Sequence, residues 1–283
     1  MHPLVIFHSP CLDGFTAAWA CWLKHPDAEF VPGVYGQEPP DCLGRDVYLL
    51  DFSYKRDVLR DMADIAKSIT VLDHHKTAAA ELGDLLTSTE SGIEGKFDME
   101  KSGARLAWEW FHPGETVPQL VRYVEDRDLW RFAVPYSKEI NAVLFSYDYD
   151  FHTWSRLRFD LESPGVREEY EAAGEAIERK QAKDVKELVG KLKHRRAFTK
   201  CWAEHPYFTP CANLPYMLAS DAAGFMAEDA SFAATYYQDA DGWFVFSLRS
   251  RGAGADVSEV AKCYGGGGHR NAAGFRVKSL EEL

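Results

Sequence analysis

The chain has 283 residues and a formal net charge of −12, from 44 acidic and 32 basic residues. Long nucleic acids usually bind a broad basic surface, because neutralising phosphates supplies most of the affinity, so this charge balance argues against a long-duplex partner. Hydrophobic residues make up 46% of the sequence, which fits a globular protein long enough for two domains.

The sequence carries no sign of a membrane or secreted protein. Its apolar runs fall short of the roughly 18 residues that span a membrane, and its N-terminus lacks the basic and apolar regions of a secretory signal. The six cysteines are scattered, which favours reduced thiols over a disulfide framework. We therefore expect a cytoplasmic protein without a membrane partner, and the oligomeric state stays open.

The first half of the chain alternates strand-like and helix-like segments. Strands are predicted at 4–8, 47–51 and 69–73, and helices at 14–23, 55–67 and 77–86. This order predicts an α/β fold with a parallel, doubly wound sheet and right-handed crossovers. Helical patterns resume at 102–111 and 117–126.

The residues after Pro164 and Gly165 differ in character. Residues 167–196 are rich in Glu, Lys, Arg and Ala without proline, which predicts a long charged connecting helix. Strand-like patterns at 232–237 and 243–248 then accompany a helix at 218–227, which is typical of a smaller α+β domain. The predicted parts are a first domain over 1–163, a helical linker over 164–197 and a second domain over 198–283.

Acidic or imidazole side chains stand at the ends of the three predicted strands. These side chains are His8 with the nearby Asp13, then Asp51, and then Asp73, His74 and His75. A single such residue is usually a helix cap or a hydrogen-bonded core residue. Three adjacent strands that end in this way favour a metal site, because open α/β sheets bind ligands at their carboxyl ends. Mixed carboxylate and imidazole ligands suit Mn²⁺ or a similar ion.

A site with two metal ions needs further carboxylates. Two ions about 3.5–4 Å apart can share one carboxylate and activate a water for attack on phosphorus, and Asp51 on the middle strand is the natural bridge. Asp126 and Asp128 lie in a polar segment that, taken alone, indicates a helix end with a capping residue. Considered together with the three strand ends, this segment predicts another metal ligand. The spacing does not decide between Asp126 and Asp128.

Four consecutive glycines at 265–268 precede a strand-like segment at 275–277. Such a run is often a linker. A glycine-rich turn can also let backbone N–H groups approach an anion, and a following helix N-terminus would add positive charge. Arg249 ends a predicted strand and would join this site, although alone it indicates an ordinary surface arginine. The predicted phosphate-binding residues are Arg249, Gly266, Gly267, Gly268, His269 and Arg270.

In combination, these motifs resemble the DHH phosphoesterase superfamily, in the branch with a DHH-associated C-terminal substrate domain. The triplet at 73–75 and the segment at 265–269 carry the resemblance, with the other motifs in the expected order. The segment at 246–250 is similar to the family segment that precedes the glycine motif. The length resembles that of the compact nanoRNase-like and oligoribonuclease-like members, whereas RecJ-type exonucleases share the core and are longer.

The resemblance implies two Mn²⁺ ions in the N-terminal domain, with Mg²⁺ or Co²⁺ as substitutes. The implied metal ligands are His8, Asp13, Asp51, His74 and either Asp126 or Asp128. The implied catalytic residues are Asp51, Asp73, His74 and His75. Asp73 would orient His74 or bind metal directly, and His75 would face the scissile phosphate. The C-terminal domain would hold the substrate's terminal phosphate or nucleotide.

One position departs from the family pattern. Members commonly carry another aspartate just ahead of the residue matched by Asp13, where this chain has Pro10 and Cys11. A thiolate is a poor match for Mn²⁺. The first metal position is therefore expected to be weaker, differently filled, or filled only with substrate.

Three interpretations of function follow. The leading one is a Mn-dependent phosphodiesterase that hydrolyses short single-stranded oligonucleotides or dinucleotides to mononucleotides. The second is a phosphatase of bisphosphorylated nucleotides or a cyclic-dinucleotide hydrolase, again with a small phosphoester as substrate. The third is a nucleotide-binding protein with weakened catalysis, which the missing carboxylate suggests. The preference for RNA or DNA and the polarity of digestion stay open.

Overall fold

The computed structural model describes residues 2–88, 92–201 and 207–283. The chain forms two compact units that divide between Glu178 and Arg179. The division falls inside helix α8 (Pro164–Leu192), so the predicted linker helix contributes residues to both units.

A parallel five-stranded sheet forms the centre of the first unit. Its strand order is β2-β1-β3-β4-β5. The strands are β1 (Leu4–His8), β2 (Glu29–Gly33), β3 (Asp46–Leu50), β4 (Ser68–Asp73) and β5 (Ile93–Phe97). The predicted parallel α/β architecture is confirmed, and the three predicted strands are β1, β3 and β4. The edge strands β2 and β5 were not predicted, because Pro32 interrupts one and charged residues with Gly95 interrupt the other.

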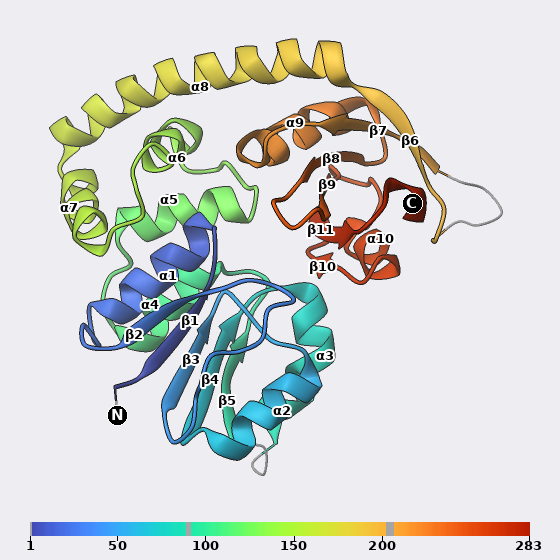
Figure 1. Cartoon of the computed structure of the whole chain (residues 1–283). Coiled ribbons are helices and arrows are strands. Elements are labelled where there is room, and N and C mark those ends of the chain that lie inside the picture. Colours follow the sequence, from blue (N-terminus) through green and yellow to red (C-terminus); the bar gives the residue numbers. More distant parts are fainter. Residues whose placement is uncertain (1, 89–91, 202–206) are drawn as a thin grey trace. The chain divides into compact units, whose positions relative to one another are not determined.

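Helices cover both faces of this sheet (Figure 1). Val5 and Phe7 pack in one core with residues of α1, α4, α5 and α7, whereas Leu4 and Ile6 pack in the other with residues of α2 and α3. Successive strand residues point to opposite faces, so a strand covered on both sides must be apolar throughout. The helices are α1 (Leu12–Trp22), α2 (Arg56–Ile65), α3 (Lys76–Thr87), α4 (Gly103–Phe111), α5 (Gln119–Asp128), α6 (Ser137–Leu144) and α7 (Phe151–Glu162).

The strand order changes direction between β1 and β3. The chain leaves β1 toward β2 on one side and then returns to β3 on the other side. In open parallel sheets, this change of direction opens a crevice at the carboxyl ends of the two strands. His8 and Asp51 stand at these two ends.

The second unit is built on a six-stranded mixed sheet. Its order is β10-β11-β9-β8-β7-β6, with β7 and β8 parallel and the other pairs antiparallel. The strands are β6 (His194–Phe198), β7 (Tyr207–Asn213), β8 (Ala233–Gln238), β9 (Phe244–Arg249), β10 (Gly267–Gly268) and β11 (Ala272–Val277). The helices are α9 (Ala219–Met226) and α10 (Val257–Cys263), with 3-10 turns at Tyr216–Leu218, Ala227–Asp229 and Leu280–Glu282. The predicted smaller α+β domain is confirmed.

Helix α8 is shorter than predicted at its C-terminus. It ends at Leu192, and residues 194–198 form strand β6 at the edge of the second sheet. The charged residues there suit a helix, but they equally suit an exposed edge strand, which proteins often protect with charge. Ion pairs one turn apart support α8 itself, such as Arg167 with Glu171 at 3.3 Å.

A disulfide joins Cys201 and Cys263, which are 62 residues apart in sequence. Their Cα atoms lie 5.9 Å apart, within the range that a disulfide spans. The expectation of reduced thiols is therefore wrong for this pair, because wide spacing hides a contact made by the fold. The other four cysteines are free.

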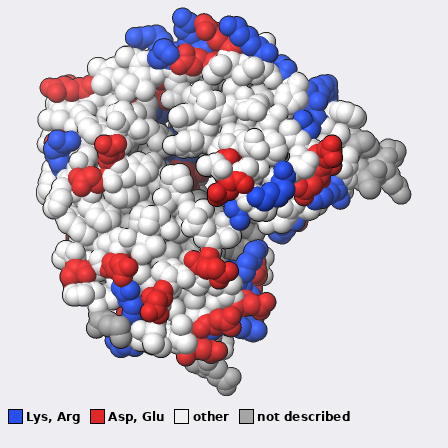
Figure 2. Space-filling model, viewed as in Figure 1, with Lys and Arg blue, Asp and Glu red and all other residues white. Residues whose placement is uncertain are grey.

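The surface shows mixed charge. On the face drawn in Figure 2, Lys and Arg side chains are interspersed with Asp and Glu, and no continuous basic patch covers the described residues visible there. Within the described ranges, no helix combines the length and the apolar character that crossing a bilayer requires.

Candidate metal centre

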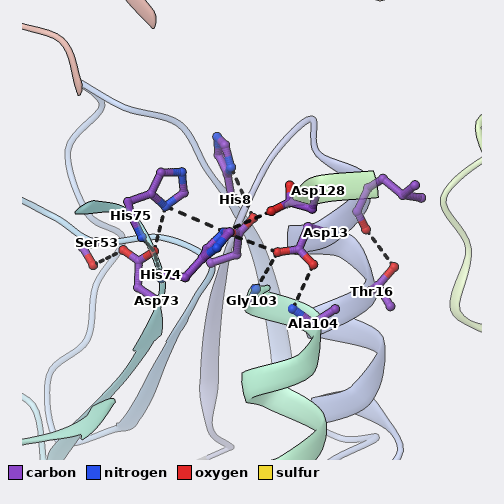
Figure 3. Close-up of polar contacts among 12 residues, drawn as sticks. His8, Asp13, Thr16, Ser53, Asp73, His74, His75, Gly103, Ala104 and Asp128 are labelled. Atoms are coloured by element: carbon purple, nitrogen blue, oxygen red, sulfur yellow. Dashed lines mark hydrogen bonds and ion pairs between the residues drawn. The ribbon is translucent and has the colours of Figure 1, made fainter. Parts of the chain in front are cut away.

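Side chains from three strand ends and two helices meet at the carboxyl edge of the first sheet (Figure 3). The strand ends contribute His8, Asp51, Asp73, His74 and His75. Helix α1 contributes Asp13 from its first turn, and α5 contributes Asp128, its last residue. The structure thus brings together residues more than 100 positions apart, as the sequence pattern predicts.

Asp51 lies at the centre of the cluster. Its carboxylate oxygens lie 3.1 Å from His74 Nε2 and 3.4 Å from His8 Nδ1. Its φ angle is 54°, an unfavourable left-handed conformation of the kind found at functional sites. Burial raises the pKa of Asp51, but hydrogen bonds and charge interactions with His74 and His8 outweigh burial and lower this pKa well below its usual range. Asp51 is therefore a buried carboxylate anion.

The N-terminus of α4 holds Asp13. The backbone N–H groups of Gly103 and Ala104 donate hydrogen bonds to its two carboxylate oxygens, at 2.6 and 3.0 Å. A helix N-terminus stabilises negative charge there. A Cβ atom at Gly103 would lie 2.4 Å from the Cβ of Asp51, so only glycine allows α4 to approach this closely. Sequence analysis missed Gly103, although Ser102, which caps α4, was a usable signal.

His74 is surrounded by three carboxylates. Its Nε2 atom lies 3.1 Å from Asp51, 3.4 Å from Asp128 and 3.7 Å from Asp13. Burial lowers the pKa of His74, but Asp128, Asp51 and Asp13 raise it well above its usual value. Burial, together with Asp51 and Asp128, raises the pKa of Asp13 well above its usual value. The three carboxylates around His74 therefore favour a positive charge at this position, which a protonated His74 or a metal ion would supply.

Asp73 holds the ring of His75. Its Oδ1 atom accepts hydrogen bonds from His75 Nδ1 at 2.7 Å and from the backbone N–H groups of His74 and His75 at 2.7 and 3.1 Å. Its Oδ2 atom accepts a hydrogen bond from the Ser53 hydroxyl at 2.5 Å. Burial raises the pKa of Asp73, but the charge and hydrogen bond of His75 lower it to about 2. Asp73 therefore orients the ring of His75, whereas it meets His74 through the backbone N–H of that residue. Ser53 is a partner that sequence analysis missed.

The structure gives Asp126 and Asp128 different contacts. The Asp126 carboxylate accepts hydrogen bonds from the backbone N–H groups of Ala133 and Val134, at 2.9 and 3.3 Å. It therefore organises the loop that follows α5. Asp128 Oδ2 lies 3.4 Å from His74 Nε2, so Asp128 belongs to the cluster.

The donor atoms fit divalent metal ions. Two groups of three residues each bring their ligand atoms within 4.8 Å of one another: His8, Asp51 and His75, and Asp13, Asp51 and His74. Both groups include Asp51, as a carboxylate shared by two ions would require. The buried Nδ1 atom of His8 faces the Asp51 carboxylate at 3.4 Å. The oxygen and imidazole donors suit Mn²⁺, Mg²⁺ or Co²⁺ better than thiolate-loving metals.

Cys11 lies beside the cluster, directly before α1. Its carbonyl oxygen accepts the first hydrogen bond of α1 from Phe15 at 3.0 Å. Burial and the charges of Asp51, Asp128 and Asp13 raise the pKa of its thiol well above the usual value. Within the part of the chain that the structure describes, Cys11 joins neither donor group. It therefore does not replace the family's missing carboxylate in this structure.

The glycine run of the second unit packs backbone against backbone. The N–H groups of Gly265 and Gly266 donate to carbonyl oxygens of Lys262 and Ala261, each at 2.9 Å. A Cβ atom at Gly266 would lie 2.1 Å from the carbonyl oxygen of Gly274. The expectation of a helix after the run is wrong, because β10 pairs there with β11 through a tight turn at 269–272. The N–H groups of Gly265 and Gly266 are therefore already engaged within the unit. The close approach at Gly266 also leaves no room for a side chain there.

Arg249 and Arg270 make contacts within the second unit. Arg249 donates hydrogen bonds to the Ser220 hydroxyl at 2.6 Å and to the carbonyl oxygen of Leu248 at 2.8 Å. Arg270 donates to the carbonyl oxygen of Gly254 at 3.2 Å and lies 3.8 Å from Asp256. The structure places Arg249 at the end of β9, opposite Ala272 of β11, near the hairpin in sheet register.

Comparison with known proteins returns one similar curated sequence and several similar folds. No family model matches the chain. An uncharacterised protein of Acanthamoeba polyphaga mimivirus is 27% identical over 303 residues, which cover 98% of this chain and 68% of that protein. Exonuclease RecJ bound to manganese has a TM-score of 0.47 and 15% identity, covering 97% of this chain and 85% of RecJ. A pGpG-specific phosphodiesterase from Vibrio cholerae has a TM-score of 0.46 and 14% identity, covering 98% and 93%.

The structure supplies the parallel sheet, the second mixed sheet and the cluster of strand-end residues that the resemblance leads one to expect. The TM-scores are below 0.5, so the function is inferred from the residues of this chain.

Proposed function

We propose that this chain is a metal-dependent phosphoesterase of the DHH superfamily that hydrolyses short oligonucleotides or dinucleotides to mononucleotides. The observation that carries the proposal is the cluster of carboxylates and imidazoles around Asp51 and His74 at the carboxyl edge of the sheet, formed by His8, Asp13, Asp51, His74 and Asp128. The net charge of −12 supports a short single-stranded substrate over a long duplex.

The proposed metal ligands are His8, Asp13, Asp51, His74 and Asp128. When bound, two divalent ions would polarise the phosphate and lower the pKa of a water for in-line attack on phosphorus. Mn²⁺ is the proposed ion, because the donors are carboxylates and imidazoles, and Mg²⁺ or Co²⁺ would substitute.

The other residues of the cluster position these groups. Asp73 accepts from Nδ1 of His75, which fixes the proton of a neutral His75 on that nitrogen. A protonated His75 could donate from Nε2 to a phosphate oxygen, as proposed for the residue that faces the scissile phosphate. The N-terminus of α4 fixes Asp13, and the left-handed backbone of Asp51 aims its carboxylate at both histidines. These contacts keep the ligands in place before substrate binds.

The second unit is proposed to bind another part of the substrate through Arg249, His269 and Arg270. Arg249 is partly buried and a guanidinium suits phosphate recognition. Gly266 and Gly268 let the chain lie close against β11, and Gly267 pairs with Gly274 of that strand. We propose that they shape this site through packing.

The test is a substrate panel with the full chain and Mn²⁺. It contains labelled RNA and DNA of two to ten nucleotides, pApA, a bisphosphorylated nucleotide and pyrophosphate. We expect mononucleotides from the shortest chains, and loss of this product in Asp51→Asn. The control is Asp46→Asn, on the opposite end of β3, where the carboxylate pairs with Lys67 at the surface. Equal inertness of the wild type and Asp51→Asn on every substrate would contradict the proposal.

A further inference from the structure

An exposed aromatic side chain borders the metal centre within the first unit. Tyr35 follows β2, whose last residue, Gly33, pairs in register with His8. The N–H of Gln37 donates to the carbonyl oxygen of Val34 at 3.1 Å, and Gly36 has a φ of 84°. These features define a type II turn with glycine at its third position. The turn therefore fixes Tyr35 at the same edge of the sheet as the catalytic cluster.

The ring of Tyr35 touches two histidines of the cluster. Its centroid lies 5.4 Å from the ring of His8 and 6.3 Å from the ring of His75. On a third side it lies 4.8 Å from Phe52, which is fully buried and directly follows Asp51. Because Phe52 belongs to the buried core and contacts Tyr35, the core helps to fix the position of the tyrosine ring.

Tyr35 is much more exposed than the aromatic rings of the core beneath it. The neighbouring rings Phe52 and Tyr54 are 0% and 8% exposed and complete the apolar cluster beneath. Tyr35 remains 46% exposed. A large ring that packs on a buried ring and leaves part of its surface exposed beside charged groups suits contact with a flat, partly apolar ligand.

We propose that Tyr35 stacks on a nucleobase of the substrate, next to the phosphate held at the metal centre. This inference rests on the proposed function and adds the side chain that would contact a base of the substrate. Inorganic pyrophosphate and sugar phosphates lack the ring that Tyr35 would cover. Base–aromatic stacking tolerates any base, because every base has a π-face, so Tyr35 would favour nucleotides without selecting one base.

The first experiment measures binding, so that it does not depend on hydrolysis. Calorimetric titration of the Mn²⁺-loaded full chain compares AMP with ribose 5-phosphate, which differ by the base. The wild type should bind AMP roughly ten-fold or more tightly. In Tyr35→Leu this preference should shrink toward equality while ribose 5-phosphate affinity stays the same, and Tyr35→Phe should keep it. The matched control is Phe159→Leu, because Phe159 is an exposed ring on α7 and is 66% exposed.

The second experiment separates this inference from the proposed function. Hydrolysis of pApA by the wild type tests the phosphoesterase proposal, whereas the ratio of AMP to ribose 5-phosphate affinity tests Tyr35. If pApA is cleaved and Tyr35→Leu keeps the wild-type ratio, the Tyr35 proposal is overturned alone. If pApA is not cleaved and the ratio still falls in Tyr35→Leu, the base contact is supported and the hydrolase proposal fails. A wild type without any preference for AMP overturns the Tyr35 proposal in either case.

Discussion

The candidate metal cluster of the first unit and the glycine run of the second unit differ in what their polar groups do. The cluster gathers buried ionisable side chains, whereas the glycine run uses its backbone N–H groups within its own fold. In the first unit, buried Asp13, Asp51 and His74 come together although they are costly to bury. In the second unit, Gly265 and Gly266 use their backbone donors on their own fold. A cluster of ionisable side chains that are costly to bury indicates a ligand, whereas a run of glycines can be explained by close packing alone.

The largest effect is expected from Gly266→Ala, which tests the packing side of this comparison. A Cβ atom there would lie 2.1 Å from the carbonyl oxygen of Gly274 and 2.6 Å from the Cβ of Phe275. Because backbone atoms cannot yield easily, we expect a loss of about 3 kcal/mol or more in the unfolding free energy of the second unit. Denaturant unfolding measures this loss, and Mn²⁺ affinity should stay within about two-fold.

A matched glycine in α8 serves as the control for that substitution. Gly190 has nothing within 4 Å of an added Cβ. Gly190→Ala should therefore stabilise the helix by roughly 0.5–1 kcal/mol. Equal stability losses in both variants would show that the close approach at Gly266 is not the cause.

The next effect concerns the two aspartates at the end of α5. Asp128→Asn should weaken Mn²⁺ binding by at least roughly 10- to 100-fold, the range seen even for outer-shell partners of metal ligands. Asp126→Asn should instead lower the unfolding free energy by about 1–3 kcal/mol, because it disturbs the hydrogen bonds to Ala133 and Val134. Electron paramagnetic resonance of bound Mn²⁺ and thermal unfolding measure the two losses. The reverse pattern would assign the ligand to Asp126.

A smaller effect is expected from Gly103→Ala in the first unit. The added Cβ would meet the Cβ of Asp51 at 2.4 Å and Asp13 Oδ2 at 2.9 Å, which would displace both carboxylates. We expect about ten-fold weaker Mn²⁺ binding and a loss of about 1–3 kcal/mol in stability. Gly83→Ala in α3 is the control, because an added Cβ there meets nothing within 4 Å. If Gly103→Ala leaves the Mn²⁺ affinity unchanged, the close approach of α4 does not contribute to metal binding.

The smallest effect concerns the thiols. Unfolded without reductant, the chain should show the four free cysteines, and two more after reduction of the Cys201–Cys263 disulfide. In the folded chain, burial raises the pKa of Cys211 to about 12. A raised pKa leaves less thiolate, about one part in 10,000 at pH 8. Cys211 should therefore react with thiol reagents only at a pH well above 8. Six thiols without reductant would contradict the disulfide.

Strand ends of the first unit could be predicted because their pattern is local. The apolar runs before His8, Asp51 and Asp73 mark buried parallel strands, and the carboxyl ends of such strands share one edge. The DHH resemblance then supplied Asp13 as a ligand. Asp126 and Asp128 could not be separated by spacing, because only the loop that returns to Asp126 shows which carboxylate is already occupied.

Other features depend on contacts that no local pattern records. Gly103 matters because its N–H group donates a hydrogen bond to Asp13, which lies 90 positions earlier in the sequence. The disulfide joins two cysteines whose neighbours in sequence give no signal. The edge strand β2 carries Pro32, which interrupts the strand pattern, so the turn that holds Tyr35 was also missed.

Titration of the metal-free chain with Mn²⁺ tests the central claim most directly. Two ions that share Asp51 should bind per chain and show magnetic coupling in their electron paramagnetic resonance signal. Asp51→Asn should lose this coupling and at least one ion, whereas the surface variant Asp46→Asn should bind as the wild type does. Uncoupled binding in the wild type, or unchanged binding in Asp51→Asn, would contradict a dinuclear centre bridged by Asp51.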